Sequence, residues 1–412
     1  MLHKFQTRLA GTSVAAALFV GITFDVRADV ISDWNARAGE FIVEAKLGTP
    51  PAIRVMALAH TAMYEAVNAV TVRDPARHVA LQAAPGAAVD AAVAAANRVI
   101  LKKLMPSQER AIEAAYQAAL EKISDGKEKA AGIAAGEHAA TAVLARREKD
   151  LTIAPEVYRP HTRAGTYVPT SAPAALPWTA RTPWRMTSPA QFRPGPPPAL
   201  DSDAWTRDYN EVRALGAKAS TSRSAEQTEV ARFWEHSLPS IYYGLVNSVA
   251  QAPNRDVTQN ARLFAAVSQA MDDAMISVFD AKYHFNFWRP VTAIRNGDLD
   301  DNDATERDAA WTSFIESPLH PEYPSAHTIL AAAVGTVLKA EMGTGPTPAL
   351  ATVNSTAKGV VRRWTSVDEI VREVADARIY EGIHFRTSTE VGAEMGRMIG
   401  TLAATELAHP QQ

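Results

Sequence analysis

The stretch from Leu151 to Leu200 constrains the fold most, because it holds 11 of the 25 prolines in this chain of 412 residues. Proline lacks a backbone donor and disfavours helix in the residue before it, so regular structure is not expected here. So long an irregular connection is unusual inside a compact protein, and it either serves a function or crosses between domains. Trp178 and Trp184 predict that it packs against the rest of the protein.

Both sides of this stretch show helical spacing. After Pro50-Pro51, apolar residues recur three and four positions apart, at Ile53, Met56, Ala59, Met63 and Val67. Alanine-rich segments near 86–104, 108–123 and 127–147 continue the pattern, and no segment alternates convincingly with period two. Capping boxes predict later helix starts at Ser224 with Gln227, Ser366 with Glu369, and Thr387 with Glu390.

We therefore predict an all-α protein of two helical bundles in one body. An N-terminal helical region is expected at 29–150, a proline-rich connection packed on the helices at 151–200, and a C-terminal bundle at 201–412. Residues 1–28 read as a signal peptide: Lys4 and Arg8 precede a short apolar stretch, and Val26-Arg27-Ala28 resembles a cleavage site. Export to the periplasm or secretion is expected.

Charge and composition exclude several classes of function. The 42 basic and 45 acidic side chains give a net charge of −3, which argues against a nucleic-acid partner or a polybasic membrane anchor. The chain has no cysteine, so thiol nucleophiles, thiolate metal sites and disulfides are excluded. No stretch after the signal peptide reaches 18 apolar residues, so no membrane span is expected.

Lys282 interrupts an apolar helix face. The stripe preceding it runs through Phe264, Val267, Met271, Ala274 and Val278. A lysine at the next position of this stripe either binds an anion or extends its amine to solvent. Asp272, Asp273 and Asp280 are expected to be its electrostatic partners, with metal binding as the less favoured alternative.

Arg378 repeats this anomaly on a second helix face. Val367, Ile370, Val371 and Val374 form the buried side of that helix, and Arg378 falls on it. Because arginine keeps its charge, it needs a carboxylate or a bound oxyanion there. A structural salt bridge to Asp376 or Glu373 is the alternative, and His384 follows after the helix-breaking Gly382.

A third segment, His320-Pro-Glu-Tyr-Pro-Ser-Ala-His327, precedes an apolar helix. Pro324 fits the first helical turn, which would leave the backbone N–H groups of Ser325, Ala326 and His327 unpaired. Such a helix start favours anions, although a lone capped helix would look similar.

Together, Lys-x6-Arg-Pro, Pro-Ser-Ala-His and Arg-x5-His resemble the three signature segments of the vanadium-dependent haloperoxidases and the type-2 phosphatidic-acid-phosphatase superfamily. The resemblance covers mainly residues 223–400. The segments Asp33-Trp34-Asn35 and 62–70 are similar to the N-terminal part of bacterial haloperoxidase-like proteins.

The resemblance implies a role for each matched residue. Lys282, Arg289 and Arg378 would neutralise an oxyanion, vanadate or phosphate, while the Ser325 hydroxyl and the Ala326 N–H would donate to it. His384 would bind the vanadium or attack phosphorus, and His327 would act as the general acid–base group. The catalytic residues would be Lys282, Arg289, His327, Arg378 and His384, whereas Ser325 and Ala326 would only bind the oxyanion.

The sequence departs from the family pattern at three positions. Ala326 stands where glycine is usual and Ala377 replaces a frequent serine. Ser388 stands where phosphatases carry the aspartate that orients the nucleophilic histidine, which disfavours phosphatase turnover.

At His320 the sequence resembles the bromoperoxidase type, which points to bromide or iodide over chloride as the substrate. The alternative is that His320 is a polar residue in a surface loop. His60, His236 and His284 are interpreted as packing or surface histidines.

Three functions follow from the resemblance. The favoured one is a vanadium-dependent haloperoxidase that oxidises halide with hydrogen peroxide to hypohalous acid. The second is an exported acid phosphatase that hydrolyses phosphate monoesters through a phosphohistidine, since phosphate fits the same site. An inactive oxyanion-binding module is the third, disfavoured because capture alone needs neither His327 nor His384. A homodimer is possible for helical faces of this size.

Overall fold

The computed structural model describes residues 29–71, 84–151 and 158–408, and the predicted all-α class is confirmed. The first half contains α1 (Val30–Glu44), α2 (Thr49–Thr71), α3 (Val89–Leu104), α4 (Glu109–Leu120), α5 (Lys127–Arg146) and α6 (Glu148–Leu151). The second half contains α7 (Asp203–Leu215), α8 (Ala225–Trp234), α9 (Pro239–Ala250), α10 (Val257–Phe285), α11 (Pro290–Arg295), α12 (Ala326–Met342), α13 (Val367–Tyr380) and α14 (Arg386–Ala408). Short 3-10 helices are η2 (Pro106–Gln108), η3 (Leu176–Ala180) and η4 (Gly297–Leu299).

One small sheet was not predicted from the sequence. Strands β1 (Leu350–Val353) and β2 (Val361–Trp364) pair antiparallel, with Leu350 opposite Trp364. Each strand has only four residues, which is too short for period-two alternation to stand out from a helical pattern.

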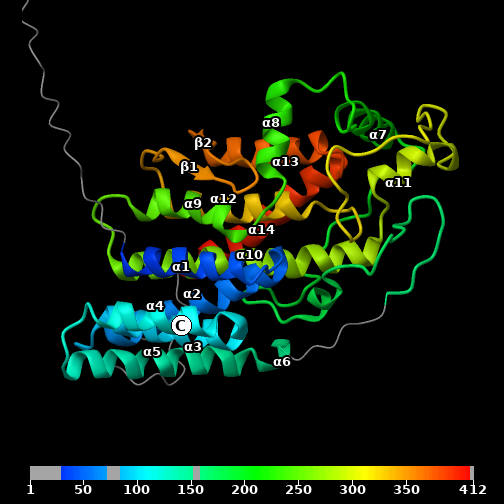
Figure 1. Ribbon diagram of the computed structural model, residues 1–412. Helices are drawn as coiled ribbons and strands as arrows, with labels where there is room; N and C mark the ends of the chain where they lie inside the picture. The colour runs from blue at the N-terminus through cyan, green and yellow to red at the C-terminus, as the bar shows by residue number, and fades with distance from the viewer. Residues whose placement is uncertain (1–28, 72–83, 152–157, 409–412) are drawn as a thin grey trace, which may run out of the picture.

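Helix α10 lies at the centre of the protein and joins the two bundles (Figure 1). On one side it packs against α2, which in turn packs against α3 and α5. On the other side it packs against α12 and α14, and these two helices also contact each other. A helix covered on opposite faces must be apolar around most of its circumference, and α10 is buried at most of its positions.

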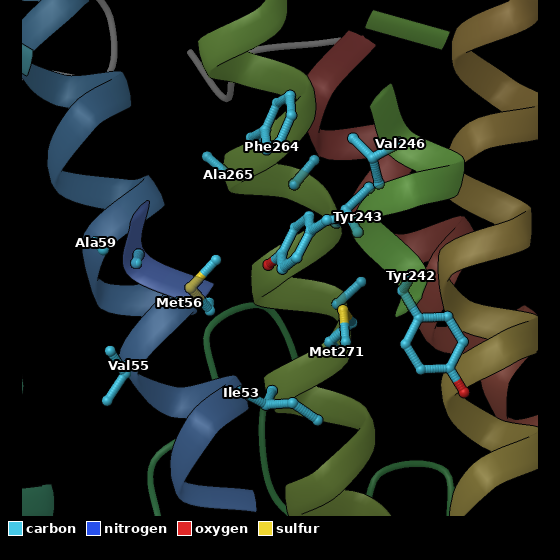
Figure 2. Close-up of a cluster of buried hydrophobic side chains, with 14 of the residues drawn as sticks. Ile53, Val55, Met56, Ala59, Tyr242, Tyr243, Val246, Phe264, Ala265 and Met271 are labelled. Carbon is cyan, nitrogen blue, oxygen red and sulfur yellow. The ribbon is translucent and has the colours of Figure 1, made fainter. Parts of the chain in front are cut away.

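The core between α2, α9 and α10 is built from aliphatic and aromatic side chains (Figure 2). Met56 on α2 lies near Tyr243 on α9, and Tyr243 stacks on Phe264 of α10 with ring centroids 5.8 Å apart. His60 is buried beside these two rings and contacts Ser268 Oγ through Nδ1 at 2.5 Å. It is thus a packing histidine, as its sequence context indicated.

The described part of the proline-rich segment has no regular structure except η3 and an isolated bridge, and α10 carboxylates anchor it. Asp273 accepts hydrogen bonds from the backbone N–H groups of Trp184 and Arg185 at 2.6 and 2.8 Å. Asp280 binds Arg193 through two hydrogen bonds of 2.8 Å. The segment therefore lies on the helices.

These contacts correct the expected partners of Lys282. Asp272 pairs with the buried Arg54 of α2, which also binds Asp150. Asp272, Asp273 and Asp280 thus bind α2 and the proline-rich segment, and none of their recorded partners is Lys282. Spacing along one helix identified these carboxylates as near the lysine, but they project toward other elements.

Two of the three predicted capping boxes are present, at Ser224 and Ser366. The third is wrong, because α14 already begins at Arg386 and Thr387 lies inside its first turn. The N–H of Thr387 donates instead to Asp208 of α7 at 2.8 Å. The Asp208 carboxylate therefore accepts a hydrogen bond from a backbone N–H group in the first turn of α14.

The predicted signal peptide, 1–28, lies outside the described residues. Within the described residues, no helix combines the length and the apolar character needed to cross a membrane.

Candidate active site

Lys282, near the end of α10, is fully buried, so its amine does not extend to solvent. Its Nζ donates to the carbonyl oxygens of Pro321 and Glu322 at 3.0 and 2.7 Å. Burial, reinforced by the nearby Arg289 charge, holds the pKa of Lys282 well below its ordinary range, although Glu322 opposes this. The amine therefore fastens the 320–327 segment to α10.

Arg289 precedes α11 and is 2% exposed. Its Nε donates to the carbonyl of His320 at 3.0 Å, and Nη1 donates to the carbonyl of Ile383 at 2.8 Å. Nη1 also lies 3.4 Å from His384 Nε2, and Nη2 lies 2.9 Å from His320 Nδ1. Burial lowers the pKa of Arg289 to about 10, so the guanidinium stays charged at neutral pH.

The start of α12 differs from the prediction by one position. Ser325 is the N-cap, so Pro324 lies before the helix and not in its first turn. The Ser325 N–H donates to the carbonyl of Ser388 at 3.0 Å, and its hydroxyl lies 3.0 Å from Thr328 Oγ1. The N–H groups of Ala326 and His327 occupy the first turn, where a helix supplies no acceptor. Two donors at a positive helix end therefore remain for an anion.

Arg378 is 1% exposed on α13, and its carboxylate partner is Glu381. Nη1 donates to Glu381 Oε1 at 2.8 Å and to the carbonyl of Trp234 at 2.7 Å. Neither alternative partner from the sequence is correct: Asp376 binds Arg386 and Glu373 binds Arg362. Arg378 Nε is buried without a hydrogen-bond partner among the described residues.

His384 is held by Glu322, which the sequence did not single out. The carboxylate Oε1 lies 2.6 Å from His384 Nδ1 and also accepts the Phe385 N–H at 3.1 Å. Both side chains are buried, and Ser388 Oγ lies 3.4 Å from the same ring nitrogen. With Nδ1 donating to the carboxylate, Nε2 carries the lone pair.

This contact changes the argument drawn from Ser388. The sequence suggests that His384 lacks an orienting carboxylate, because position 388 is serine. Glu322 supplies that carboxylate from another part of the chain. The sequence feature that could have identified Glu322 is its position as an acidic residue between two prolines inside the 320–327 segment.

Five of the eight candidate residues line one cavity of about 750 Å³: His320, Ala326, His327, Arg378 and His384. Lys282, Arg289 and Ser325 lie behind this lining and contact the segments that form it. His236, expected to be a packing or surface residue, also lines the cavity. The three sequence segments therefore converge on one site.

The histidines of this site are held neutral. Burial lowers the pKa values of His320, His327 and His384 well below the ordinary value of 6.5, and neighbouring lysine and arginine charges add to the effect. His327 Nε2 is buried and has no hydrogen-bond partner among the described residues. It is therefore free to accept a proton from a molecule in the cavity.

The donor set suits an anion better than a bare metal cation. Three cationic side chains approach the site, whereas the described residues contain no group of three or more histidines and carboxylates placed to bind a metal ion. One neutral histidine nitrogen, helix N–H groups and excess positive charge together match an oxyanion.

Comparisons with known proteins agree with this geometry. Residues 262–411 match the family model of the VCPO second helical-bundle domain. An alignment over 192 residues, which covers 38% of this chain, shows 31% identity to the vanadium chloroperoxidase of Curvularia inaequalis and spans 31% of that relative's length. The structure superposes on a bacterial vanadium-dependent iodoperoxidase with a TM-score of 0.76 and 25% identity, covering 91% of this chain and 95% of the other. Residues 262–411 therefore match a domain of the vanadium chloroperoxidase type, and the chain has the fold of bacterial vanadium haloperoxidases.

The predicted resemblance to the vanadium-dependent haloperoxidase superfamily is thus confirmed. Among the superfamily's solved structures, the holo-type bacterial vanadium-dependent chloroperoxidase has a TM-score of 0.69 at 18% identity, covering 94% of this chain and 99% of that one. The apo-type structure has the same TM-score at 17% identity. These two likenesses establish a shared fold.

Proposed function

We propose that this chain is a vanadate-dependent haloperoxidase that oxidises bromide or iodide with hydrogen peroxide to hypohalous acid. The observation that carries the proposal is the state of His384. Its Nδ1 is fixed by a buried carboxylate at 2.6 Å, while its neutral Nε2 faces Arg289 at the site formed by the three cations. A histidine held in this way is a monodentate ligand for an oxyanion's central atom.

The residues present fit vanadate. His384 Nε2 would supply the protein ligand, Lys282, Arg289 and Arg378 would balance the charge, and the Ala326 N–H would donate to an oxygen. When bound, vanadate supplies a Lewis-acidic centre that activates hydrogen peroxide toward halide. The Arg289 Nη1 proton that now faces His384 Nε2 would then be available to an oxyanion oxygen. A bound anion would also offset the Arg289 and Arg378 charges, which add to the effect of burial in lowering the pKa of Lys282.

The two remaining cavity histidines have different roles in this proposal. His327 takes a proton from peroxide as it binds, because its free Nε2 stays unprotonated at neutral pH. His320 is fixed through Nδ1 by Arg289 and packs edge-on against Phe279. Its ring forms part of the cavity wall, which is where a halide would approach.

An acid phosphatase is the second candidate, and one observation favours it. Glu322 orients His384 in the way that a nucleophilic histidine requires, so Ser388 no longer counts against phosphohistidine chemistry. The two functions would use the same cations and the same acid–base group.

Activity on one sample separates the two functions. With vanadate, hydrogen peroxide and bromide or iodide, the full chain is expected to form hypohalous acid, with less product from chloride. Inorganic phosphate is expected to inhibit by competing with vanadate, because the site recognises charge and tetrahedral shape. Hydrolysis of a phosphate monoester without any halide oxidation would establish the second candidate instead.

Glu322→Gln is expected to weaken vanadate binding by about 10- to 100-fold, because it keeps a hydrogen-bond acceptor for His384 but removes the charge that fixes and strengthens the ligand. Equilibrium dialysis with vanadium quantification measures the effect. As a matched control, Ser388→Asp in the Glu322→Gln background returns a carboxylate to the same nitrogen, which Ser388 already approaches at 3.4 Å. Recovery of binding is expected. An unchanged affinity in Glu322→Gln would refute this positioning role.

A further inference from the structure

Met275 is the one sulfur-containing side chain among the described residues that line the cavity of the candidate site. It lies on α10, one turn before Phe279, and His327 and His384 line the same cavity. The chain has no cysteine, so no thiol competes with this thioether for an oxidant. Under the proposed function, hypohalous acid forms in the same space, beside a side chain of the kind that such oxidants attack first.

Access to the Met275 sulfur is restricted to the cavity. Only 1% of Met275 is exposed, whereas Met342 and Met398 are half-buried elsewhere on the protein. An oxidant dissolved in the surrounding solution therefore reaches Met342 and Met398 first, whereas an oxidant formed within the cavity reaches Met275 first. The order in which these methionines are oxidised thus reports where the oxidant forms.

Trp178 is another oxidisable side chain in the wall of the cavity. The Arg181 guanidinium lies over its ring, 4.4 Å from the centroid. This cation covers one face of the indole and draws π-electron density toward itself, which makes the ring less reactive toward an electrophilic halogen. The Met275 sulfur is therefore the favoured target.

We propose that Met275 is a modification site, converted to methionine sulfoxide by hypohalous acid that the chain itself forms, and that this oxidation limits the number of turnovers. The inference rests on the proposed function. The sulfur lone pair attacks the halogen of HOX, the O–X bond breaks and hydroxide leaves. Water then displaces halide from sulfur, so that R₂S and HOX give R₂SO, H⁺ and X⁻. Sulfur is oxidised by two electrons, and the halogen is reduced to halide.

The sulfoxide changes the wall beside the histidines of the site. It places a strongly polar oxygen among Pro51, Phe279 and Leu330, where a flexible apolar side chain packs in the unmodified protein. A buried acceptor without a donor is unfavourable, so the wall is expected to rearrange. His327 lies one turn before Leu330 on α12, and its position depends on that packing. Turnover is therefore expected to fall as the sulfoxide accumulates.

The position of the oxidation is measured on the full chain loaded with vanadate. Bromide and successive additions of hydrogen peroxide are supplied, with excess free methionine in solution to consume hypobromous acid that has left the protein. Trypsin releases residues 263–282 as one peptide, and fragment ions from between Met271 and Met275 show which sulfur has gained an oxygen. Met271 is fully buried in the core of Figure 2 and serves as the internal control. We expect Met275 to be oxidised at least about tenfold more than Met271, Met342 or Met398.

Hypobromite added without hydrogen peroxide or free methionine is the reference, and it should oxidise Met342 and Met398 before Met275. Bromide oxidation that leaves Met275 reduced would refute the inference but keep the proposed function. Absence of bromide oxidation would refute the proposed function, and the inference would lose its oxidant. Suppression of the Met275 sulfoxide by free methionine would overturn the inference, because the oxidant would then come from solution. Formation of the sulfoxide without bromide would overturn it too, because the oxidant would then be peroxide.

Met275→Leu tests the effect on turnover, because leucine is similar in volume and carries no sulfur. Met271→Leu is the matched control, one turn away on the same helix. Each variant is compared with its own initial rate, so that a change in catalytic efficiency cancels. We expect Met275→Leu to keep most of its activity at the number of turnovers where the unaltered chain and Met271→Leu have lost half. Equal loss of activity in the two leucine variants would show that Met275 does not limit turnover.

Discussion

The His384→Ala variant is expected to retain no vanadate after dialysis, although the unaltered chain does. The substitution removes the only protein atom expected to bond to the central atom and leaves hydrogen bonds and ion pairs alone to hold the anion. Halide oxidation should disappear with the vanadium. Phosphate binding should fall less, because a phosphate held by charge alone does not need the histidine.

A folding control is needed for this experiment. His384→Ala leaves the buried Glu322 carboxylate without its histidine partner, which costs about 1–3 kcal/mol or more in stability. The double variant His384→Ala/Glu322→Ala removes that unpaired carboxylate and should recover thermal stability but not vanadium content. Full vanadium content in either variant would show that His384 is not the ligand.

The His327→Ala variant is expected to keep its vanadate and lose turnover. Removal of a general acid–base group typically lowers kcat by about 10²–10⁴-fold, whereas the cations and His384 that hold the anion are untouched. His236→Ala is the matched control, because His236 lines the same cavity but is exposed. It should change kcat by no more than about threefold, as expected for a residue without a role in proton transfer.

The pH profile supplies a second readout for His327. Burial and the Arg378 charge hold its pKa well below 6.5, so the neutral base persists as the pH falls through that value. Activity should therefore decline only at clearly lower pH, and this acid limb should be absent from the residual activity of His327→Ala. A kcat close to that of the unaltered chain, with normal vanadium content, would remove His327 from the mechanism.

Periodicity along single helices was sufficient to find the cations of this site. Lys282 and Arg378 occupy the positions where their helices present an apolar stripe, and both are buried. A charge on a buried stripe is a local feature, because its position depends only on the helical repeat. The all-α class followed from the same repeat.

The carboxylate partners could not be found in this way. Glu322 lies 62 residues from His384 and meets it only because the 320–327 segment and the start of α14 pack together. Arg378 had three acidic residues within five positions, and only the packing of α13 selected Glu381. Spacing restricts the choice of partner to a few residues, whereas the direction in which each side chain points is set by tertiary contacts.

The proline-rich segment illustrates the same limit. Its lack of regular structure follows from composition, but its anchoring by Asp273 and Asp280 depends on which face of α10 it crosses. The β1–β2 hairpin was missed for a simpler reason, since four-residue strands give too little pattern to recognise.

The central position of α10 has a consequence for how the chain can be divided. Its Phe264 and Met271 pack into the core with α2, while its last turn carries Lys282 to the site. A fragment beginning at residue 201 would include every candidate site residue yet expose the face of α10 that α2 covers. The proline-rich stretch is therefore a boundary in sequence only, and we expect the two bundles to unfold together in a single thermal transition.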